Sequence, residues 1–490
     1  SHLGWRERRA ISLAMRPAQA LRLLCCLRGC STASAAAPAG DISSVVSAIG
    51  DTYQWPEQFA LLKERLRPDG ELLRAAWRRL DSALDRELAE IAHRQQDIIP
   101  VVEFSSIQRN GGRIPEELQG EIKKRGVVIV RGVVGSETAR GWKKAVEEYA
   151  RSNPSHVGFP RDNPQVLELY WSKPQVEARQ HPNMHETMLA INRLWSGSKD
   201  HVSLEHAFSY GERLRIRQPG RGFSLHPHTD GGSIERFEDP HYKAVYRHLW
   251  DGRWEDYDPW AAADERALAN VSMYAGEVAN GYCTVFRAFQ GWMAISSIAA
   301  GPDAGTLRVL PLLREATAFM MLRPFLDDVP AADFCGAIPG MAHDVTPRWH
   351  AKLHAGLLPI PAMAPGDTVW WHSDLVHAVE ALHNGTEDSS VFYVPSFPAT
   401  VRNAAYLARQ RERFGAGRTP PDFPPNDSEM DFVGRATEQD LTALGRRMLG
   451  FEPLSSGSIA ACSASGGSCS SGGGDDSNTL LAALNEALGF

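Results

Sequence analysis

A histidine and an aspartate two positions apart, followed by a pair of glycines, mark the stretch HPHTDGGSIERFEDP at residues 226–240. His228 and Asp230 offer an imidazole and a carboxylate, and the two glycines supply a turn directly after them. About one such triplet is expected by chance in a chain with 17 histidines, and a second one occurs at His372 and Asp374. The triplet by itself therefore does not identify a metal site.

The chemistry that these residue types could support is that of non-haem Fe(II). Such sites use two histidines and one carboxylate on one side of the metal and leave the opposite positions open. On a β-barrel the first histidine and the carboxylate come from one strand end, so the second histidine must come from a later strand. His377, in PGDTVWWHSDLVHAVE, meets this requirement because a predicted turn and strand precede it. The residues alone leave two interpretations open: a metal triad of His228, Asp230 and His377, or unconnected surface histidines.

Neighbouring residues are candidate contacts of such a site. His226 shares a strand face with His228, and could be a ligand, a substrate contact or a surface residue. Arg215 and Arg217, in RLRIRQPG, share one face of a predicted strand and could bind an anionic substrate. The alternative for both arginines is a solvated or salt-bridged strand face.

The second triplet, His372 and Asp374, is interpreted differently. The histidines that follow it, His377 and His383, are too close in sequence to lie on another strand of a barrel. We therefore interpret this triplet as structural, or as a neighbour of the metal site rather than a ligand.

The elements that would position these residues are predicted from hydrophobic periodicity. Apolar residues at intervals of three and four predict helices over residues 55–98. The β-branched run at 125–134 predicts a strand, and several more strands are expected from about residue 203 onward. The acidic and aromatic insertion at 235–282 is interpreted as a lid or substrate-lining segment, with a purely structural extension as the alternative.

The composition excludes several classes of function. The chain has 490 residues, 43% hydrophobic and 23% charged, with a net charge of −7 and no dense run of Lys and Arg in its body, so no nucleic-acid partner is expected. The chain has no stretch of 18 uninterrupted apolar residues, so no membrane span is expected. Only Cys283 and Cys335 of the seven cysteines lie in the globular body, which argues against a disulfide framework or a C-x-x-C zinc site.

The two ends of the chain differ from its body. From Met15 to Gly40 the sequence is rich in Arg, Ser and Ala and has no acidic residue, which predicts an organellar targeting segment, a mitochondrial one more than a chloroplast one. The alternative is a disordered tail on a cytoplasmic protein. The expected organisation is a targeting or disordered segment (1–40), a helical extension (41–100), the main domain (101–454), a Ser/Gly-rich linker (455–478) and a short terminal helix (479–490).

A series of motifs in the main domain resembles a known family. LRIRQPG, HTDGGSIERFEDP, CTVFRAFQGW, GTLRVLPLL, PGDTVWWHSDLVHAVE and SSVFYVPSFP follow one another between about residues 100 and 450. The series resembles the YbiU-like family of unknown function, within the phytanoyl-CoA-dioxygenase-like Fe(II)/2-oxoglutarate oxygenases. The resemblance implies an α+β fold with a double-stranded β-helix (jelly-roll, cupin-like) core and N-terminal helices packed outside it.

The same resemblance implies a function. It is that of a dioxygenase that uses molecular oxygen, Fe(II) and the co-substrate 2-oxoglutarate to oxidise, most simply by hydroxylation, a small organic substrate that the sequence does not identify. His228, Asp230 and His377 would hold the iron, and the aspartate argues against a halogenase, which leaves that ligand position empty. The oligomeric state stays open.

One position departs from the family pattern. In the phytanoyl-type enzymes an arginine about ten residues after the distal histidine binds the far carboxylate of 2-oxoglutarate, but here Ser389 and Ser390 stand at that place. Ser390 can donate a hydrogen bond but cannot neutralise the charge. We expect Arg287, Arg308 or Arg402 to take the role, with an internal salt bridge as the alternative for each. Arg287 is the first choice and is predicted to lie in the middle of a strand, in CTVFRAFQGW.

Two other functions remain compatible with the sequence. One is a metal-binding cupin-type isomerase or hydrolase that uses zinc. The other is a catalytically silent barrel that acts as a binding protein, with the Ser/Gly-rich tail and terminal helix as a docking arm.

Overall fold

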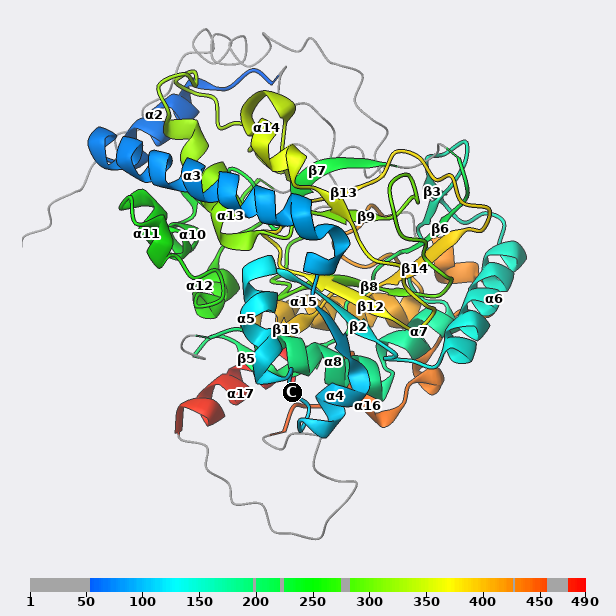
Figure 1. Ribbon diagram of the computed structural model, residues 1–490. Helices are drawn as coiled ribbons and strands as arrows, with labels where there is room; N and C mark the ends of the chain where they lie inside the picture. Colours follow the sequence, from blue (N-terminus) through cyan, green and yellow to red (C-terminus); the bar gives the residue numbers. More distant parts are fainter. Residues whose placement is uncertain (1–52, 197–199, 221–223, 275–282, 426–427, 456–474) are drawn as a thin grey trace, which may run out of the picture. The chain divides into compact units, whose positions relative to one another are not determined.

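The computed structural model describes residues 53–196, 200–220, 224–274, 283–425, 428–455 and 475–490. The predicted targeting segment and most of the predicted Ser/Gly-rich linker lie outside the described residues. All described residues belong to one compact unit, residues 39–490. The structure is a mixed α+β fold, as predicted (Figure 1).

Two sheets form the centre of this fold. The strands of the larger sheet are β1 (Val101–Glu103), β2 (Val127–Arg131), β3 (Gly158–Phe159), β4 (Val166–Leu167), β6 (Leu214–Arg217), β8 (Gln290–Ala294), β12 (Thr368–Trp371) and β14 (Ser389–Tyr393). Those of the smaller sheet are β7 (Leu225–Thr229), β9 (Leu307–Val309), β10 (His343–Asp344), β11 (Leu358–Pro359) and β13 (His377–Val379). A separate pair consists of β5 (Ser203–Phe208) and β15 (Phe397–Ala399).

The chain passes repeatedly between the two sheets. The larger sheet has the order β1-β2-β12-β8-β14-β6-β4-β3, and the smaller sheet β10-β7-β13-β9-β11. From β6 onward, β6, β8, β12 and β14 join the larger sheet, whereas β7, β9, β11 and β13 join the smaller one. Strands far apart in sequence thereby become neighbours.

The inner faces of the two sheets can be identified from packing. Tyr393 of β14 packs with Val379 of β13 and Leu225 of β7, so its side of the larger sheet faces the smaller sheet. Residues opposite one another on antiparallel strands share a face. Because Tyr393 lies opposite Trp292, this rule places alternate residues of β8, β14 and β6 on the inner side.

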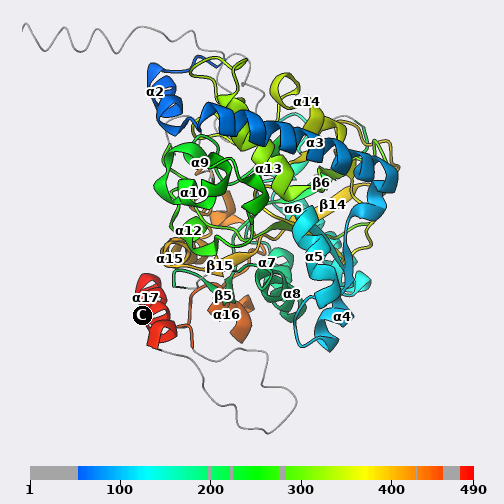
Figure 2. The same cartoon turned by 60° about the vertical axis from the view of Figure 1, so that its left-hand side comes forward.

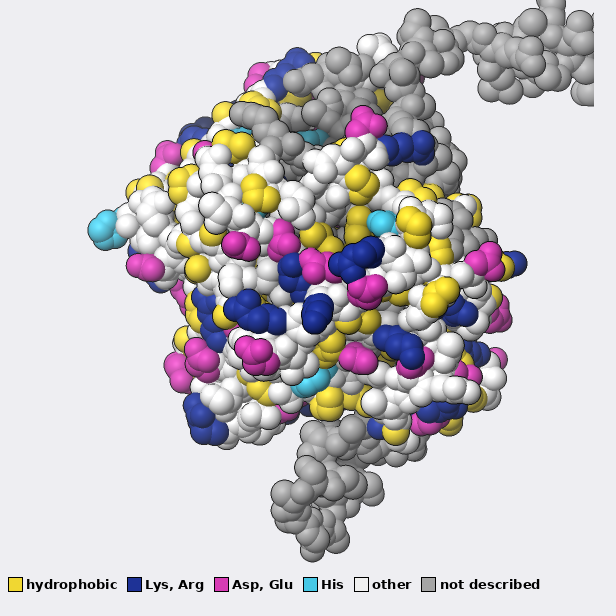
Figure 3. Space-filling view, turned by 90° about the vertical axis from the view of Figure 1, so that its right-hand side faces the viewer, with side chains coloured by type: hydrophobic (Ala, Val, Ile, Leu, Met, Phe, Trp, Pro, Cys, Tyr) yellow, Lys and Arg dark blue, Asp and Glu magenta, His cyan; other side chains and the backbone are white. Residues whose placement is uncertain are grey.

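Helices cover the sheets. They are α2 (Glu57–Leu66), α3 (Gly70–Arg94), α4 (Phe104–Arg109), α5 (Glu116–Arg125), α6 (Ser136–Ser152), α7 (Lys173–Arg179), α8 (Pro182–Asn192), α9 (Glu235–Glu238), α10 (Pro240–Val245), α11 (Arg247–Trp250), α12 (Ala263–Leu268), α13 (Leu313–Leu322), α14 (Pro347–Ala355), α15 (Val401–Ala416), α16 (Ala443–Met448) and α17 (Asp475–Leu488). Among the described helices, none combines the length and apolarity needed to cross a membrane. Charges of both signs are interspersed on the face shown in Figure 3.

The N-terminal helices predicted over residues 55–98 form as α2 and α3. Asp69 begins α3 by accepting hydrogen bonds from the backbone N–H groups of Glu71 and Leu72. The buried side of α3 carries Leu73, Leu80 and other apolar residues spaced by three and four. Helix α3 packs against α13, and the two lie side by side in both views (Figures 1 and 2).

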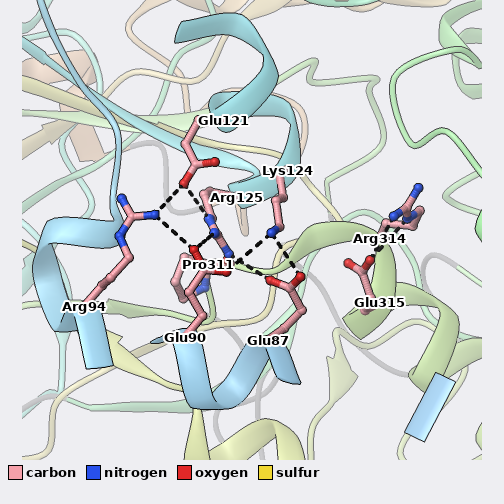
Figure 4. Close-up of polar contacts among 9 residues, drawn as sticks. All are labelled: Glu87, Glu90, Arg94, Glu121, Lys124, Arg125, Pro311, Arg314 and Glu315. Carbon is pink, nitrogen blue, oxygen red and sulfur yellow. Dashed lines mark hydrogen bonds and ion pairs between the residues drawn. The ribbon is translucent and has the colours of Figure 1, made fainter. Parts of the chain in front are cut away.

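A buried arginine forms ion pairs that connect α3 and α5. Arg125, at the end of α5, bonds to Glu87 and Glu90 of α3, to Glu121 of its own helix, and at 3.5 Å to the carbonyl of Pro311 (Figure 4). Arg125 is buried, whereas its carboxylate partners are partly exposed. The guanidinium thus joins two carboxylates of α3 to one carboxylate of α5.

Replacing Arg125 by alanine is expected to lower the free energy of unfolding by about 2 kcal/mol, because the three carboxylates lose their buried partner and keep only the more exposed Arg94 and Lys124. Arg94 is the control, since it binds Glu90 and Glu121 from a more exposed position. Its replacement by alanine should cost less than about 1 kcal/mol. Denaturant unfolding followed by tryptophan fluorescence measures both, and equal losses in the two variants would refute a special role of Arg125.

Candidate metal centre

Two neighbouring strands of the smaller sheet bring the predicted triad together. His228 lies near the end of β7, Asp230 directly follows this strand, and His377 begins β13. His377 and His228 lie opposite one another in the antiparallel pairing of these strands. Gly231 and Gly232 have φ angles of 81° and 98°, so the turn after Asp230 uses backbone conformations that favour glycine.

The three side chains converge on one point. The Nε2 atom of His377 is 3.4 Å from one carboxylate oxygen of Asp230, and the Nε2 atom of His228 is 3.8 Å from the other. One ligand atom from each residue lies within 4.8 Å of those of the other two. Both histidines are buried, whereas Asp230 is partly exposed.

Backbone carbonyls fix the orientation of both imidazole rings. The Nδ1 atom of His228 is 2.7 Å from the carbonyl of His226, and that of His377 is 3.0 Å from the carbonyl of Leu375. A carbonyl can only accept, so Nδ1 carries the proton in both rings. Each Nε2 atom therefore presents a lone pair toward Asp230, as a metal ligand must.

The electrostatics of the cluster favour the same protonation states. Burial and the neighbouring His377 lower the pKa of His228 to about 3, so its ring is neutral at pH 7. Burial by itself would raise the pKa of Asp230, but the positive charge of Arg287 favours the ionised carboxylate, and the pKa lies below its ordinary value. A neutral imidazole beside an ionised carboxylate is the state in which these groups bind a metal.

Gln290 and Trp371 are site residues that the sequence analysis missed. The Gln290 side chain, on β8 of the larger sheet, donates a hydrogen bond to the carboxylate of Asp230. Trp371 lies opposite Gln290 on β12, with its ring 5.2 Å from that of His377. The larger sheet thus closes over the triad. No local motif distinguishes Gln290, which only its cross-sheet position brings to the site.

The other two candidate histidines, His226 and His372, lie outside the triad. His226 bonds through Nε2 to the carboxylate of Asp344, at 2.7 Å. His372 is buried and stacks on the ring of Trp195, and its Nδ1 accepts a hydrogen bond from the backbone N–H of Asp374. His372 and Asp374, the second triplet, are both buried, and neither belongs to the group of possible metal ligands among the described residues.

The four residues predicted to hold the co-substrate are placed differently from expectation. Arg287 lies in irregular chain before β8, not within a strand, although it is close enough to Asp230 to lower its pKa. Arg308 lies opposite Ala378, so it points to the other face of the sheet from His377, where it bonds to the carbonyl of Leu357.

The side chains of Arg402 and Ser390 also bond to groups outside the triad. Arg402 bonds to the carbonyls of Leu268 and Ala269 at the end of α12. Ser390 lies opposite Ile216, on the outer face of the larger sheet, and donates to Asp388. The predictions for Arg308, Arg402 and Ser390 are therefore wrong in position, because strand alternation and helix contacts direct these side chains elsewhere.

Arg215 and Arg217 are buried between the sheets. Arg217 lies opposite Ser389 and Arg215 opposite Val391, on the face that also carries Tyr393. Their exposed fractions are 1% and 0%. The alternative of a solvated or salt-bridged strand face is wrong, since within the described residues no carboxylate lies at ion-pair distance from either guanidinium.

The donors of these two arginines are largely unused. Among the described residues, the Nε and Nη2 atoms of both have no hydrogen-bond partner, and neither has the buried hydroxyl of Ser389. The one recorded bond runs from Nη1 of Arg217 to the carbonyl of Gly305, at 3.2 Å. Burial lowers the pKa of both groups, and burial together with Arg215 lowers that of Arg217 to about 10. Unpaired buried cations are costly, which indicates a place for an anion.

Comparison with known proteins gives consistent matches over most of the chain. The Gig2-like family profile matches residues 53–451. The uncharacterized protein YbiU of Escherichia coli K12 is 35% identical over 373 residues, 72% of this chain and 85% of that protein.

Two solved structures are similar over a larger share of the chain. The GlcNAc-inducible gene 2 protein of Candida albicans is 29% identical with a TM-score of 0.77, over 89% of this chain and 96% of that one. A Salmonella typhimurium LT2 protein, provisionally described as an oxidoreductase, is 31% identical with a TM-score of 0.73, over 84% and 100%.

Proposed function

We propose a function for the cluster of His228, Asp230 and His377 in this chain, which belongs to the Gig2-like family, as its resemblance to YbiU-like proteins predicted. The protein is a non-haem Fe(II)- and 2-oxoglutarate-dependent dioxygenase that oxidises a small organic substrate. The observation that carries this proposal is the convergence of two oriented Nε2 atoms and one carboxylate on a single point. Three ligands on one side leave room for a co-substrate and oxygen.

The strand order supports a double-stranded β-helix as the core of this enzyme. Eight strands, β6 to β9 and β11 to β14, contribute four to each sheet, in the orders β6-β14-β8-β12 and β7-β13-β9-β11. All neighbours in these two sets are antiparallel. In such a core the ligand strands β7 and β13 lie in one sheet, and the opposite sheet supplies the wall of a site between them.

The buried pair Arg215 and Arg217 would replace the arginine that phytanoyl-type enzymes use to bind the far carboxylate of 2-oxoglutarate. Arg217 lies directly across from Ser389, so a guanidinium stands one strand away from the position where phytanoyl-type enzymes have their arginine. The carboxylate of Glu380 is near enough to raise the pKa of Arg217, but it accepts its hydrogen bonds from backbone N–H groups. Two cations and one anion leave one positive charge, which the far carboxylate of 2-oxoglutarate would neutralise.

Different residues of the chain would contribute to different parts of this reaction. Bound Fe(II) would couple the oxidative decarboxylation of 2-oxoglutarate by oxygen, which yields succinate and carbon dioxide, to the oxidation of a substrate C–H bond. His228 and His377 would bind the metal through Nε2, and Gln290 orients the carboxylate of Asp230. Arg215 and Arg217 hold the co-substrate, and Trp371 helps to exclude water beside His377.

The direct test is turnover of 2-oxoglutarate by protein loaded with Fe(II) under exclusion of air and then exposed to oxygen. We expect succinate and carbon dioxide in equal amounts, with slow uncoupled turnover in the absence of substrate. Tight binding of zinc without any succinate would favour the cupin-type isomerase or hydrolase. Failure to bind any divalent metal would favour the catalytically silent binding protein.

A further inference from the structure

A buried carboxylate next to the metal centre gathers side chains from the insertion at 235–282. Asp374 lies in the turn between β12 and β13, three residues before His377. Its carboxylate accepts hydrogen bonds from Arg236 and Arg266, and from the hydroxyls of Tyr246 at 3.1 Å and Tyr257 at 3.4 Å. All four donors come from the insertion.

Arg236 differs from Arg266 in what else it contacts. Besides Asp374, Arg236 donates from Nη2 to the carbonyl of Asp230 and, at 2.8 Å, from Nε to the carbonyl of Gly232. The other recorded bond of Arg266 goes to the hydroxyl of Tyr257, at 3.4 Å. One guanidinium therefore joins the segment that carries Asp230 to the turn that leads into His377.

We propose that Arg236 is a positioning residue that sets the placement of Asp230 relative to His377. The insertion then serves to lock the two metal-binding segments in register, a role beyond a lid or a structural extension. The inference rests on the proposed metal site, because only a bound ion makes the relative placement of these two side chains matter. Side chains that orient metal ligands contribute strongly to metal affinity.

The charges of the cluster make a matched experiment possible. Two buried guanidiniums face one buried carboxylate, and burial is nearly complete for all three. Changing either arginine to glutamine leaves a balanced pair of one cation and one anion, which favours folding of both variants. Arg236→Gln removes the bonds to the Asp230 and Gly232 carbonyls, whereas Arg266→Gln leaves them in place.

The measurement is a titration of each full-length variant with Co(II), whose visible absorption reports both occupancy and ligand geometry. We expect Arg236→Gln to weaken Co(II) binding by about 10- to 100-fold and to alter the absorption bands. Arg266→Gln should bind Co(II) with the affinity and spectrum of the unchanged protein, although thermal unfolding shifts by a similar amount in both variants. The Lys pair, Arg236→Lys and Arg266→Lys, replaces the Gln pair if either fails to fold.

Two outcomes separate this inference from the proposed function. If both variants lose the same affinity, or neither loses any, Arg236 has only the structural role that Arg266 also has, and the inference is overturned. If the unchanged protein binds neither Co(II) nor Fe(II), the proposed metal site itself fails, independently of Arg236.

Discussion

Changing His228, Asp230 or His377 to alanine is expected to weaken Fe(II) binding by more than about a hundredfold and to abolish succinate formation. Loss of a partner that merely orients a metal ligand costs about 10- to 100-fold in affinity, so loss of a ligand should cost more. Metal analysis after anaerobic loading and a succinate assay measure the two effects on the same sample. Both should disappear together, because turnover depends on the iron.

The control for this prediction is His372→Ala. His372 is as buried as the triad histidines and precedes His377 by five residues, but it stacks on Trp195 and lies outside the triad. The variant should lose stability, as expected for a cavity in the core, while the folded fraction keeps its iron. Iron lost from His372→Ala and kept in His377→Ala would show that the ligand on this segment is misassigned.

Changing Arg215 or Arg217 to glutamine is expected to raise the requirement for 2-oxoglutarate about a hundredfold, with iron content unchanged. This factor corresponds to about 3 kcal/mol, the range expected when a buried charge loses its partner. Without 2-oxoglutarate the thermal stability of the variants should not fall, because each variant removes one of two buried cations that face a single nearby carboxylate, that of Glu380. The apparent KM and the melting temperature with and without 2-oxoglutarate measure these effects.

Arg308→Gln and Arg287→Gln are the controls for the arginine pair. Arg308 points away from the triad, so its replacement should leave the KM for 2-oxoglutarate unchanged. Arg287 lies near Asp230, but its nearest recorded carboxylate, Glu212, is 3.9 Å away. A large rise in KM for Arg287→Gln, with no change for Arg215→Gln and Arg217→Gln, would return the role to Arg287.

The parts of the fold that repeat a local pattern could be predicted from the sequence. The periodic apolar residues of α3 and the β-branched run of β2 determine their own secondary structure, and both are confirmed. The mixed α+β class and the family are confirmed as well. The strand expected around Arg287 is shorter than predicted, since the ladder with β12 begins only at Gln290.

The role that we propose for Arg215 and Arg217 could not be predicted, because the environment of both side chains depends on strand pairing. In sequence, two arginines at alternate positions are typical of a solvated strand face. Only the pairing of β6 with β14 places Arg215 and Arg217 on the inner face of the larger sheet. The prediction for Arg308 was wrong for a related reason. Side chains alternate along β9, so Arg308 points away from the site, although the neighbouring strand β13 carries His377 toward it.

An anaerobic spectroscopic titration of the full-length protein with Fe(II) and then 2-oxoglutarate shows whether the triad and the arginine pair form one site. A keto acid that chelates a ferrous ion gives a visible charge-transfer absorption that neither component gives alone. We expect this absorption with one iron per chain, its loss in His377→Ala, and a higher 2-oxoglutarate concentration for half-saturation in Arg217→Gln. Iron binding without any absorption change on addition of 2-oxoglutarate would show that the protein is not a 2-oxoglutarate-dependent enzyme.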